Sequence, residues 1–221
     1  FVKAFRNAIA DTATACVACG KCYEVCPITD SANVGGLDGE AVTARVRRIL
    51  AGAGIDKVAE RWASACVLSG ECISSCDYGV NPRLMMAMAR LVSKESRQDA
   101  DELKSQGLES FKALGTGVKV LSRMQLGQKD LERLGQAGAR KTAPGAPKPD
   151  YVFYAGCNVL KTPHIALLCL DIMDALGIKY EVLGGPSHCC GILQYRAGDI
   201  ETSSKVATNS IEKFQGSGAT E

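Results

Sequence analysis

Apolar residues recur at helical spacing along residues 1–92, which predicts several short helices. The first apolar face starts at the first residue and has three members: Phe1, Phe5 and Ile9. A second face, which stops at Gly52, has four aliphatic members: Val42, Val46, Ile49 and Leu50. A third helix is predicted from Asn81, as N-cap, and Pro82, at the first helical position. Its apolar stripe, in which we expect the methionines to fill core space, is Leu84, Met85, Met88, Leu91 and Val92.

Between residues 93 and 136 the pattern changes to one or two charged, amphipathic helices. Five apolar positions at helical spacing support this prediction: Leu108, Phe111, Leu114, Val118 and Leu121. The mixed charges beside them indicate a solvated face. The segment AGARKTAPGAPKPD follows at residues 137–150, and its small residues and prolines are typical of an extended linker.

From Tyr151 the chain alternates between strand and helix patterns. The runs YVFYA and KYEVL are predicted strands, and PHIALLCLDIMDALG between them is a predicted helix. Strand, helix and strand in this order form a βαβ unit, which implies a parallel sheet. A last amphipathic helix is predicted at residues 200–214. One βαβ unit has too few strands for a stable sheet, so we expect the native chain to continue past Glu221. The apolar face at Phe1 similarly suggests that it begins upstream.

These patterns predict an α + α/β fold in three parts. Residues 1–92 form a helical domain, residues 93–150 a helical connector and linker, and residues 151–221 the first part of an α/β domain. The net charge of +2 over 221 residues argues against a nucleic-acid partner. No apolar run approaches the roughly 20 residues that cross a bilayer. We therefore expect a cytoplasmic protein, with peripheral association at the inner face of the cytoplasmic membrane through a partner.

Cysteine use is unusual, because the chain has eleven cysteines and they are bunched. Bunched thiols favour metal binding over a disulfide scaffold. The run Cys16-x2-Cys19-x2-Cys22-x3-Cys26-Pro27 has the spacing of iron–sulfur ligation in bacterial ferredoxins. A structural zinc site that uses a pair of these cysteines is the alternative.

A second run, ACVLSGECISSCDYG at residues 65–79, repeats this spacing with one thiol missing. Ser69 stands in the second cysteine slot and Asp77 in the proline slot. Ligation in two-cluster ferredoxins is crossed, so the last cysteine of each run serves the other cluster. This predicts a [4Fe–4S] cluster at site I, which we define as Cys16, Cys19, Cys22 and Cys76. It predicts a [3Fe–4S] cluster at site II, which we define as Cys26, Cys66 and Cys72 with Ser69 in the missing-ligand slot. A second [4Fe–4S] cluster, with a Ser69 oxygen or water on the odd iron, is the alternative.

The two runs on a framework of short helices resemble the α-helical ferredoxin domain of succinate dehydrogenase and fumarate reductase iron–sulfur subunits. The glycerol-3-phosphate dehydrogenase iron–sulfur subunit and the C-type subunit of heterodisulfide reductase carry a similar domain. The Cys-x5-Cys-x3-Cys form from Cys66 to Cys76 matches the succinate dehydrogenase pattern, for which the resemblance implies a [3Fe–4S] cluster. The heterodisulfide reductase relatives more commonly have a complete second run, so Ser69 departs from that group.

The segments GCNVLKTPH and HCCGI carry a second resemblance, to the first half of the cysteine-rich CCG domain in the B-type subunit of heterodisulfide reductase. The family motif continues with a Cys-x-x-Cys pair, which its spacing would place just beyond Glu221. The resemblance implies a further iron–sulfur cluster at the CCG site, which we define as Cys157, Cys189 and Cys190. Buried cysteines at a turn are the alternative. His188 either donates to a cluster sulfur or is satisfied within its loop, and Cys169 is expected in the core.

Together the two resemblances imply a fused, heterodisulfide-reductase-like iron–sulfur subunit. Its expected function is electron transfer from a flavoprotein dehydrogenase partner to a quinone or carrier protein. A catalytic disulfide reductase that acts at the CCG site is the alternative, and a binding module stabilised by its clusters is a third hypothesis. Trp62, just before Cys66, is expected to shield a cluster, because burial and hydrogen bonding tune cluster potentials.

Overall fold

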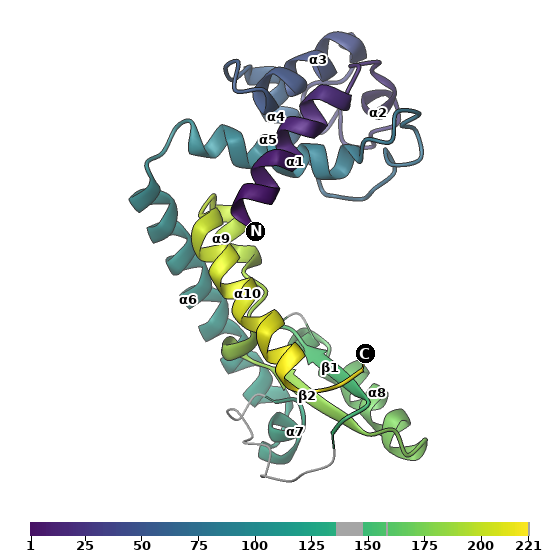
Figure 1. Ribbon diagram of the computed structural model, residues 1–221, viewed down its shortest axis with the longest axis vertical. Helices are drawn as coiled ribbons and strands as arrows, with labels where there is room; N and C mark the ends of the chain where they lie inside the picture. Colours follow the sequence, from purple (N-terminus) through teal and green to yellow (C-terminus); the bar gives the residue numbers. More distant parts are fainter. Residues whose placement is uncertain (136–147, 158, 221) are drawn as a thin grey trace. The chain divides into compact units, whose positions relative to one another are not determined.

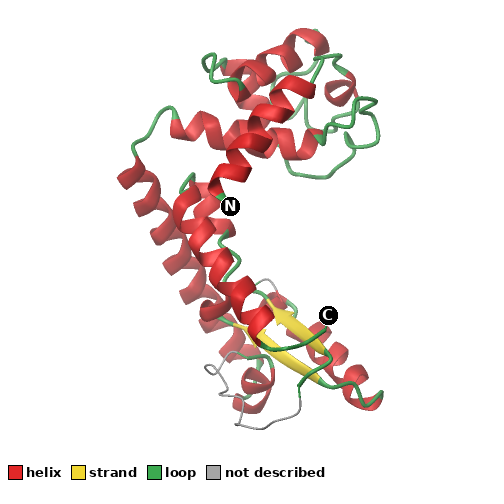
Figure 2. Ribbon diagram, in the orientation of Figure 1, coloured by secondary structure: helices red, strands yellow, loops and turns green. Residues whose placement is uncertain are grey.

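The computed structural model describes residues 1–135, 148–157 and 159–220. These residues are mostly helical and include one small parallel sheet (Figure 2). The chain divides into two compact units. The first comprises Phe1–Leu103 and Arg196–Gly198, and the second comprises Lys104–Tyr195 and Asp199–Glu221.

The helices of the first unit are short, and three of them are started by polar caps. They are α1 (Val2–Ala15), α2 (Lys21–Glu24), α3 (Gly39–Leu50), α4 (Lys57–Ala65) and α5 (Pro82–Glu95) (Figure 1). Asp38, Asp56 and Asn81 cap α3, α4 and α5, each through a side-chain oxygen that accepts a backbone N–H at 2.9 or 3.0 Å. Such a bond satisfies a donor that the helix itself leaves without a partner. The predicted N-cap at Asn81 is therefore confirmed.

The core of the first unit lies between α1, α3, α4 and α5. The predicted aliphatic face of α3 is buried throughout: Val42, Val46, Ile49 and Leu50. Met85 and Met88 are each 1% exposed, so the prediction that methionines fill this core is confirmed. The predicted faces are wrong at two edge positions. Phe1, which precedes the first helical residue and stacks on Phe5, is 67% exposed. Leu84, in the first turn of α5, is 43% exposed.

The second unit is built around the predicted βαβ arrangement. Its elements are α6 (Ala100–Gln125, which begins in the first unit), α7 (Gln128–Arg133), β1 (Tyr151–Ala155), η1 (Val159–Lys161), α8 (Pro163–Ala175), β2 (Tyr180–Gly184), η2 (Pro186–His188), α9 (Ile192–Ala197, which ends in residues assigned to the first unit) and α10 (Ile200–Gly216). β1 and β2 pair in parallel, from Tyr151 opposite Tyr180 to Ala155 opposite Gly184. Both strands, the helix between them and the last helix were predicted, whereas α9 was not.

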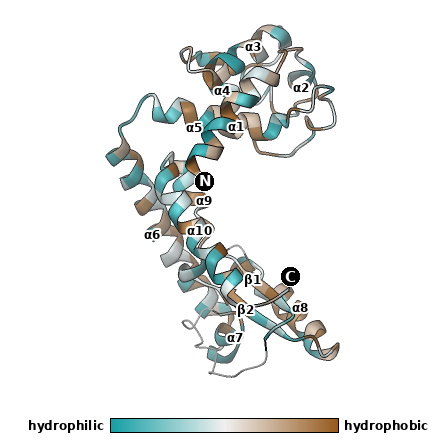
Figure 3. Cartoon of the chain, in the orientation of Figure 1, coloured by the Kyte–Doolittle hydropathy of each residue, from teal (hydrophilic) through white to brown (hydrophobic). Residues whose placement is uncertain are grey.

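α8 buries one face and leaves another exposed. Leu170 is fully buried with Ala166, and both pack in a core that includes Leu134 and Leu160. Figure 3 shows apolar residues along α8. Three of these, Ile165, Leu168 and Ile172, are at least half exposed, as is the C-cap residue Leu176. This buried face of α8 packs against side chains of the sheet.

The segment that connects the two cysteine-bearing regions is helical, as predicted. In α6, however, Leu108 and Leu121 are 50% and 45% exposed, so parts of the predicted apolar stripe face solvent. The predicted linker at residues 137–150 lies largely outside the described residues. Within the described part of the chain, no helix combines the length and apolar character that a bilayer crossing requires.

Candidate iron–sulfur sites

The loop between α1 and α2 carries the first three cysteines of the chain. α1 ends at Cys16, its C-cap, and Gly20 starts α2 with a φ of +78°. A Cβ atom at Gly20 would lie 2.8 Å from the backbone carbonyl carbon of Gly39. Only glycine accepts both the left-handed conformation and this close approach to α3. The turn at Gly20 therefore fixes where Cys19 and Cys22 lie.

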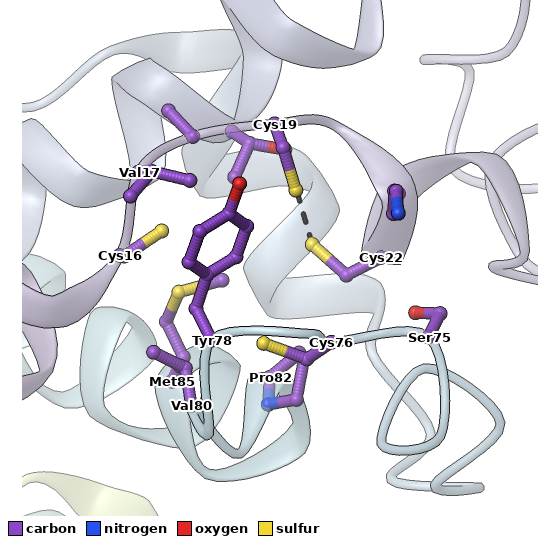
Figure 4. Close-up of a pocket in the computed structure, with 13 residues that line it drawn as sticks. Cys16, Val17, Cys19, Cys22, Ser75, Cys76, Tyr78, Val80, Pro82 and Met85 are labelled. Atoms are coloured by element: carbon purple, nitrogen blue, oxygen red, sulfur yellow. Dashed lines mark hydrogen bonds between the residues drawn. The ribbon is translucent and has the colours of Figure 1, made fainter.

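The four cysteines of site I line one cavity, although Cys76 comes from the second run. Figure 4 shows Cys16, Cys19, Cys22 and Cys76 around this cavity, whose volume is about 330 Å³ including its open mouth. The ring of Tyr78 also lines it. Asp77, which stands in the proline slot, forms an ion pair with Lys21 of α2. This pair joins the second cysteine run to the first, beside Cys76.

The residues of site II line a second cavity next to the first. This cavity, of about 390 Å³ including its open mouth, is bordered by Cys26, Cys66, Cys72 and Ser69. Cys22 borders both cavities, so the two sites share a wall. Arg83, at the start of α5, also lines the second cavity and brings a positive charge to it.

The two cysteine runs have the same local backbone. Cys66 is the C-cap of α4, as Cys16 is of α1. Ala18 and Leu68, two residues later in each run, both adopt left-handed φ values, of +60° and +61°. Non-glycine residues seldom adopt this conformation, so its presence in both runs indicates one shared loop design. Ser69 therefore occupies the place that Cys19 has in the first run.

Buried side chains contact the sulfur atoms of each site. The indole N–H of Trp62 donates to Cys26 Sγ at 3.3 Å, and Trp62 is only 1% exposed. The Thr43 hydroxyl lies 3.9 Å from Cys22 Sγ. Burial raises the pKa of Cys22 to about 12 and raises that of Cys72, because a free thiolate is poorly solvated there. Both groups are therefore neutral thiols at pH 7 until a metal replaces their protons.

Arginine side chains bind backbone carbonyl groups at the ends of α1 and α4, the helices that precede the two cysteine runs. Arg90 donates to the carbonyl oxygens of Ala63 and Cys66, at 2.8 and 2.6 Å through its Nη2 atom. Arg47 donates to the Cys16 carbonyl oxygen at 3.4 Å. Carbonyl groups at a helix end have few partners within the helix, and these bonds supply donors to them; the Ala63 oxygen also accepts the Cys66 N–H. Neither arginine has a sequence signal that would link it to its cysteine, because each contact joins distant parts of the chain.

The CCG site lies beyond the carboxyl ends of the two parallel strands, where α/β folds place their ligands. Cys157 follows β1, and Cys189 and Cys190 follow η2, which comes after β2. Gly191 has a φ of +76°, and a Cβ atom there would lie 2.7 Å from the Ser203 carbonyl oxygen. The glycine of the CCG motif is therefore required by the packing of α10. Cys190 is exposed, whereas Cys157 and Cys189 are partly buried.

Tyr154 on β1 is part of this site, although no sequence motif pointed to it. Burial raises its pKa to about 12, and the thiols of Cys190, Cys189 and Cys157 add to the shift. Its hydroxyl donates to the His188 carbonyl oxygen at 2.9 Å. The only sequence signal was its place in a strand that leads to Cys157. His188 is satisfied within its loop, because its Nδ1–H donates to the Gly184 carbonyl oxygen at 2.7 Å.

The donor sets fit iron–sulfur clusters. All eleven cysteines are free thiols, and seven of them line the two cavities of the first unit. Among the described residues, no three His, Cys, Asp or Glu side chains converge closely enough to hold a single metal ion. Thiolates on a cluster bind different irons and so stand farther apart than the ligands of one ion. Cys169, on the partly buried side of α8, belongs to none of the three sites.

Comparison with known proteins adds two findings. Residues 151–220 match the family model of the cysteine-rich CCG domain. The chain is also 25% identical, over 163 residues, to the D-type subunit of the dihydromethanophenazine:CoB–CoM heterodisulfide reductase of Methanosarcina acetivorans. The match covers 70% of this chain and 36% of the relative, so the chain spans about a third of that protein's length. No solved structure matches the chain.

These findings confirm the resemblance to heterodisulfide reductase that the sequence predicted. Residues 151–220 form a CCG cysteine-rich domain. The similarity of the chain to a heterodisulfide reductase subunit supports an iron–sulfur redox protein. The cluster types, the ligand sets and the partners stay predictions.

Proposed function

We propose that the chain is the electron-transfer subunit of an oxidoreductase complex. In this proposal it relays electrons from a flavoprotein dehydrogenase to a quinone or a carrier protein. The observation that carries the proposal is that two cysteine sets, brought together from both runs, line adjacent cavities that share Cys22. Two redox centres with a common wall are suited to passing electrons from one to the other.

Each cysteine set has a defined part in this proposal. Site I would hold a [4Fe–4S] cluster on its four thiolates, and site II a [3Fe–4S] cluster on its three. The CCG site would hold a third cluster. When bound, these clusters supply one-electron storage and transfer. The residues around them exclude water and set the local charge, and for this role the burial of Cys22 and Trp62 is favourable.

The charge around the two cavities favours one direction of electron flow. Arg83 lines the site II cavity, and its charge lowers the pKa of Cys72 against the larger effect of burial. Lys21, which lines the site I cavity, is paired with Asp77 and so contributes less net charge. A positive charge stabilises a centre that has gained an electron. Electrons are therefore expected to pass from site I to site II.

The alternative is a catalytic disulfide reductase that acts at the CCG site. The exposure of Cys190 favours it, because a substrate disulfide could reach this sulfur. The name of the relative from Methanosarcina acetivorans points to the same chemistry in that protein. In a scaffold role, the third hypothesis, the clusters would only stabilise the fold.

Electron acceptors distinguish these functions. The chain is reduced with dithionite, freed of excess reductant and mixed anaerobically with a soluble quinone or with a small organic disulfide. An electron-transfer subunit is reoxidised by the quinone and leaves the disulfide intact. A disulfide reductase instead produces two thiols for every two electrons and two protons consumed. Reduced clusters that neither acceptor reoxidises would contradict both functions and favour the scaffold. Cys169→Ser, outside all three sites, is the matched control and is expected to behave as the wild type.

A further inference from the structure

In the described part of the chain, a buried side chain lies within hydrogen-bonding reach of a cysteine sulfur at each of the first two sites, and the two side chains differ in kind. At site II the donor is the indole N–H of Trp62, 3.3 Å from Cys26 Sγ. At site I the Thr43 hydroxyl lies 3.9 Å from Cys22 Sγ, and it is the donor when Cys22 is a thiolate, which has no proton to give. Trp62 and Thr43 are each only 1% exposed, so water does not compete for these sulfurs from the donors' side.

The two donors are not copies of each other in the repeated loop design. Trp62 lies one helical turn before Cys66, and the matching place before Cys16 is taken by Thr12. Met86 also lines the site II cavity, but it is not a donor there, because its thioether cannot donate a hydrogen bond. The two sites therefore differ in their buried donors although their backbones match.

Trp62 is also held in place more firmly than a surface donor. Its ring packs edge-to-face on Tyr23, with centroids 5.3 Å apart, in the core between α2 and α4. Tyr23 is itself fixed, because its hydroxyl donates to the Val34 carbonyl oxygen and accepts the Leu37 N–H. The indole N–H therefore keeps its direction toward Cys26 when the charge of the site changes.

We propose that Trp62 and Thr43 are positioning residues that set the reduction potentials of site II and site I independently. The inference rests on the proposed function, because it requires a cluster at each site. Uptake of one electron adds one negative charge, which is shared by the cluster and its thiolates. A hydrogen bond to a ligand sulfur stabilises this reduced form more than the oxidised form and so raises the potential. The shorter hydrogen bond, from the indole N–H to Cys26 Sγ, is expected to raise the potential more.

The single tryptophan of the chain allows a test without changing the shape of the core. Growth of a tryptophan-auxotrophic host on β-(3-benzothienyl)alanine replaces the indole N–H by sulfur at position 62 alone. The purified chain is then titrated anaerobically with dithionite, and the signal of each cluster is followed by EPR. We expect the potential of site II to fall and that of site I to stay at the wild-type value. 5-Fluorotryptophan, which keeps the N–H, is the matched control and should leave site II near the wild-type potential.

Thr43→Val supplies the reciprocal result, a lower potential at site I with site II unchanged. An unchanged site II potential in the benzothienyl protein, or an equal shift at both sites, would overturn the inference while leaving the proposed function intact. If the wild-type chain has no iron–sulfur signal at all, the proposed function fails, and the inference fails with it.

A second measurement needs no substitution. In a chain labelled with ¹⁵N only at the tryptophan indole, pulsed EPR of site II is expected to show a ¹⁵N hyperfine coupling, with none at site I. A site II signal without this coupling contradicts the contact between Trp62 and Cys26.

Discussion

In the proposed assignment of the clusters, Ser69 is the residue that decides the type of cluster at site II. It stands in the same backbone frame as Cys19, because Leu68 and Ala18 before them share a left-handed conformation. It also lines the cavity of site II with three cysteines. A serine hydroxyl is far less acidic than a thiol and is a poor ligand for iron. Three thiolates without a fourth suit a cluster of three irons.

The substitution Ser69→Cys is expected to convert site II to a four-iron cluster. The new thiol has the backbone position of a ligand, so it can bind a fourth iron. An oxidised [3Fe–4S] cluster has an odd electron and an EPR signal without reductant, whereas an oxidised [4Fe–4S] cluster is silent. The variant should therefore lose this signal and gain iron, and the potential of site II should fall.

Ser69→Ala is the matched control for this change, because it removes the hydroxyl and adds no thiol. It should keep the wild-type signal. A signal that is absent from the wild type and appears only in the alanine variant would instead show that the serine oxygen holds a fourth iron.

At the scale of elements, each of the two cysteine runs contributes its last cysteine to the cavity that the other run mainly forms. Cys76, from the second run, lines the cavity of site I, and Cys26, from the first run, lines that of site II. Cys76→Ala should therefore perturb the four-iron signal of site I and leave the signal of site II largely intact, as measured by EPR before and after reduction. Cys169→Ala should change neither signal. The crossed assignment is wrong if Cys26→Ala, rather than Cys76→Ala, removes the signal of site I.

A glycine turn positions the CCG motif, and the loss of stability on replacing this glycine can be measured. In Gly191→Ala, a Cβ atom would be 2.7 Å from the Ser203 carbonyl oxygen at a φ of +76°. Gly177→Ala has a similar φ of +67° but meets nothing within 4 Å. The left-handed strain is about 1–2 kcal/mol in both. In urea unfolding, Gly191→Ala should be the more destabilising variant because of the added overlap, and equal effects would contradict the packing described.

At the scale of the whole molecule, local signals in the sequence predicted much of the fold. β1 was predictable because it is a short apolar run closed by Gly156, and β2 because a short strand-like run is closed by the turn residues GGP. α5 was predictable because Asn81 and Pro82 mark its start. α9, Ile192–Ala197, is too short for an apolar period to show. Cysteine spacing predicted which cysteines come together at the cavities of site I and site II. The contacts of Trp62 with Cys26 and of Arg90 with Cys66 depend on the packing of separate helices, which no spacing encodes.

The central claim is that the chain carries two different clusters in two adjacent sites. Its most direct test is an EPR-monitored reduction of the wild-type chain, purified anaerobically. We predict one signal that is present as isolated and disappears on reduction, from site II, and another that appears only on reduction, from site I. A chain that contains no iron, or that holds only clusters silent in the oxidised form, would contradict this account.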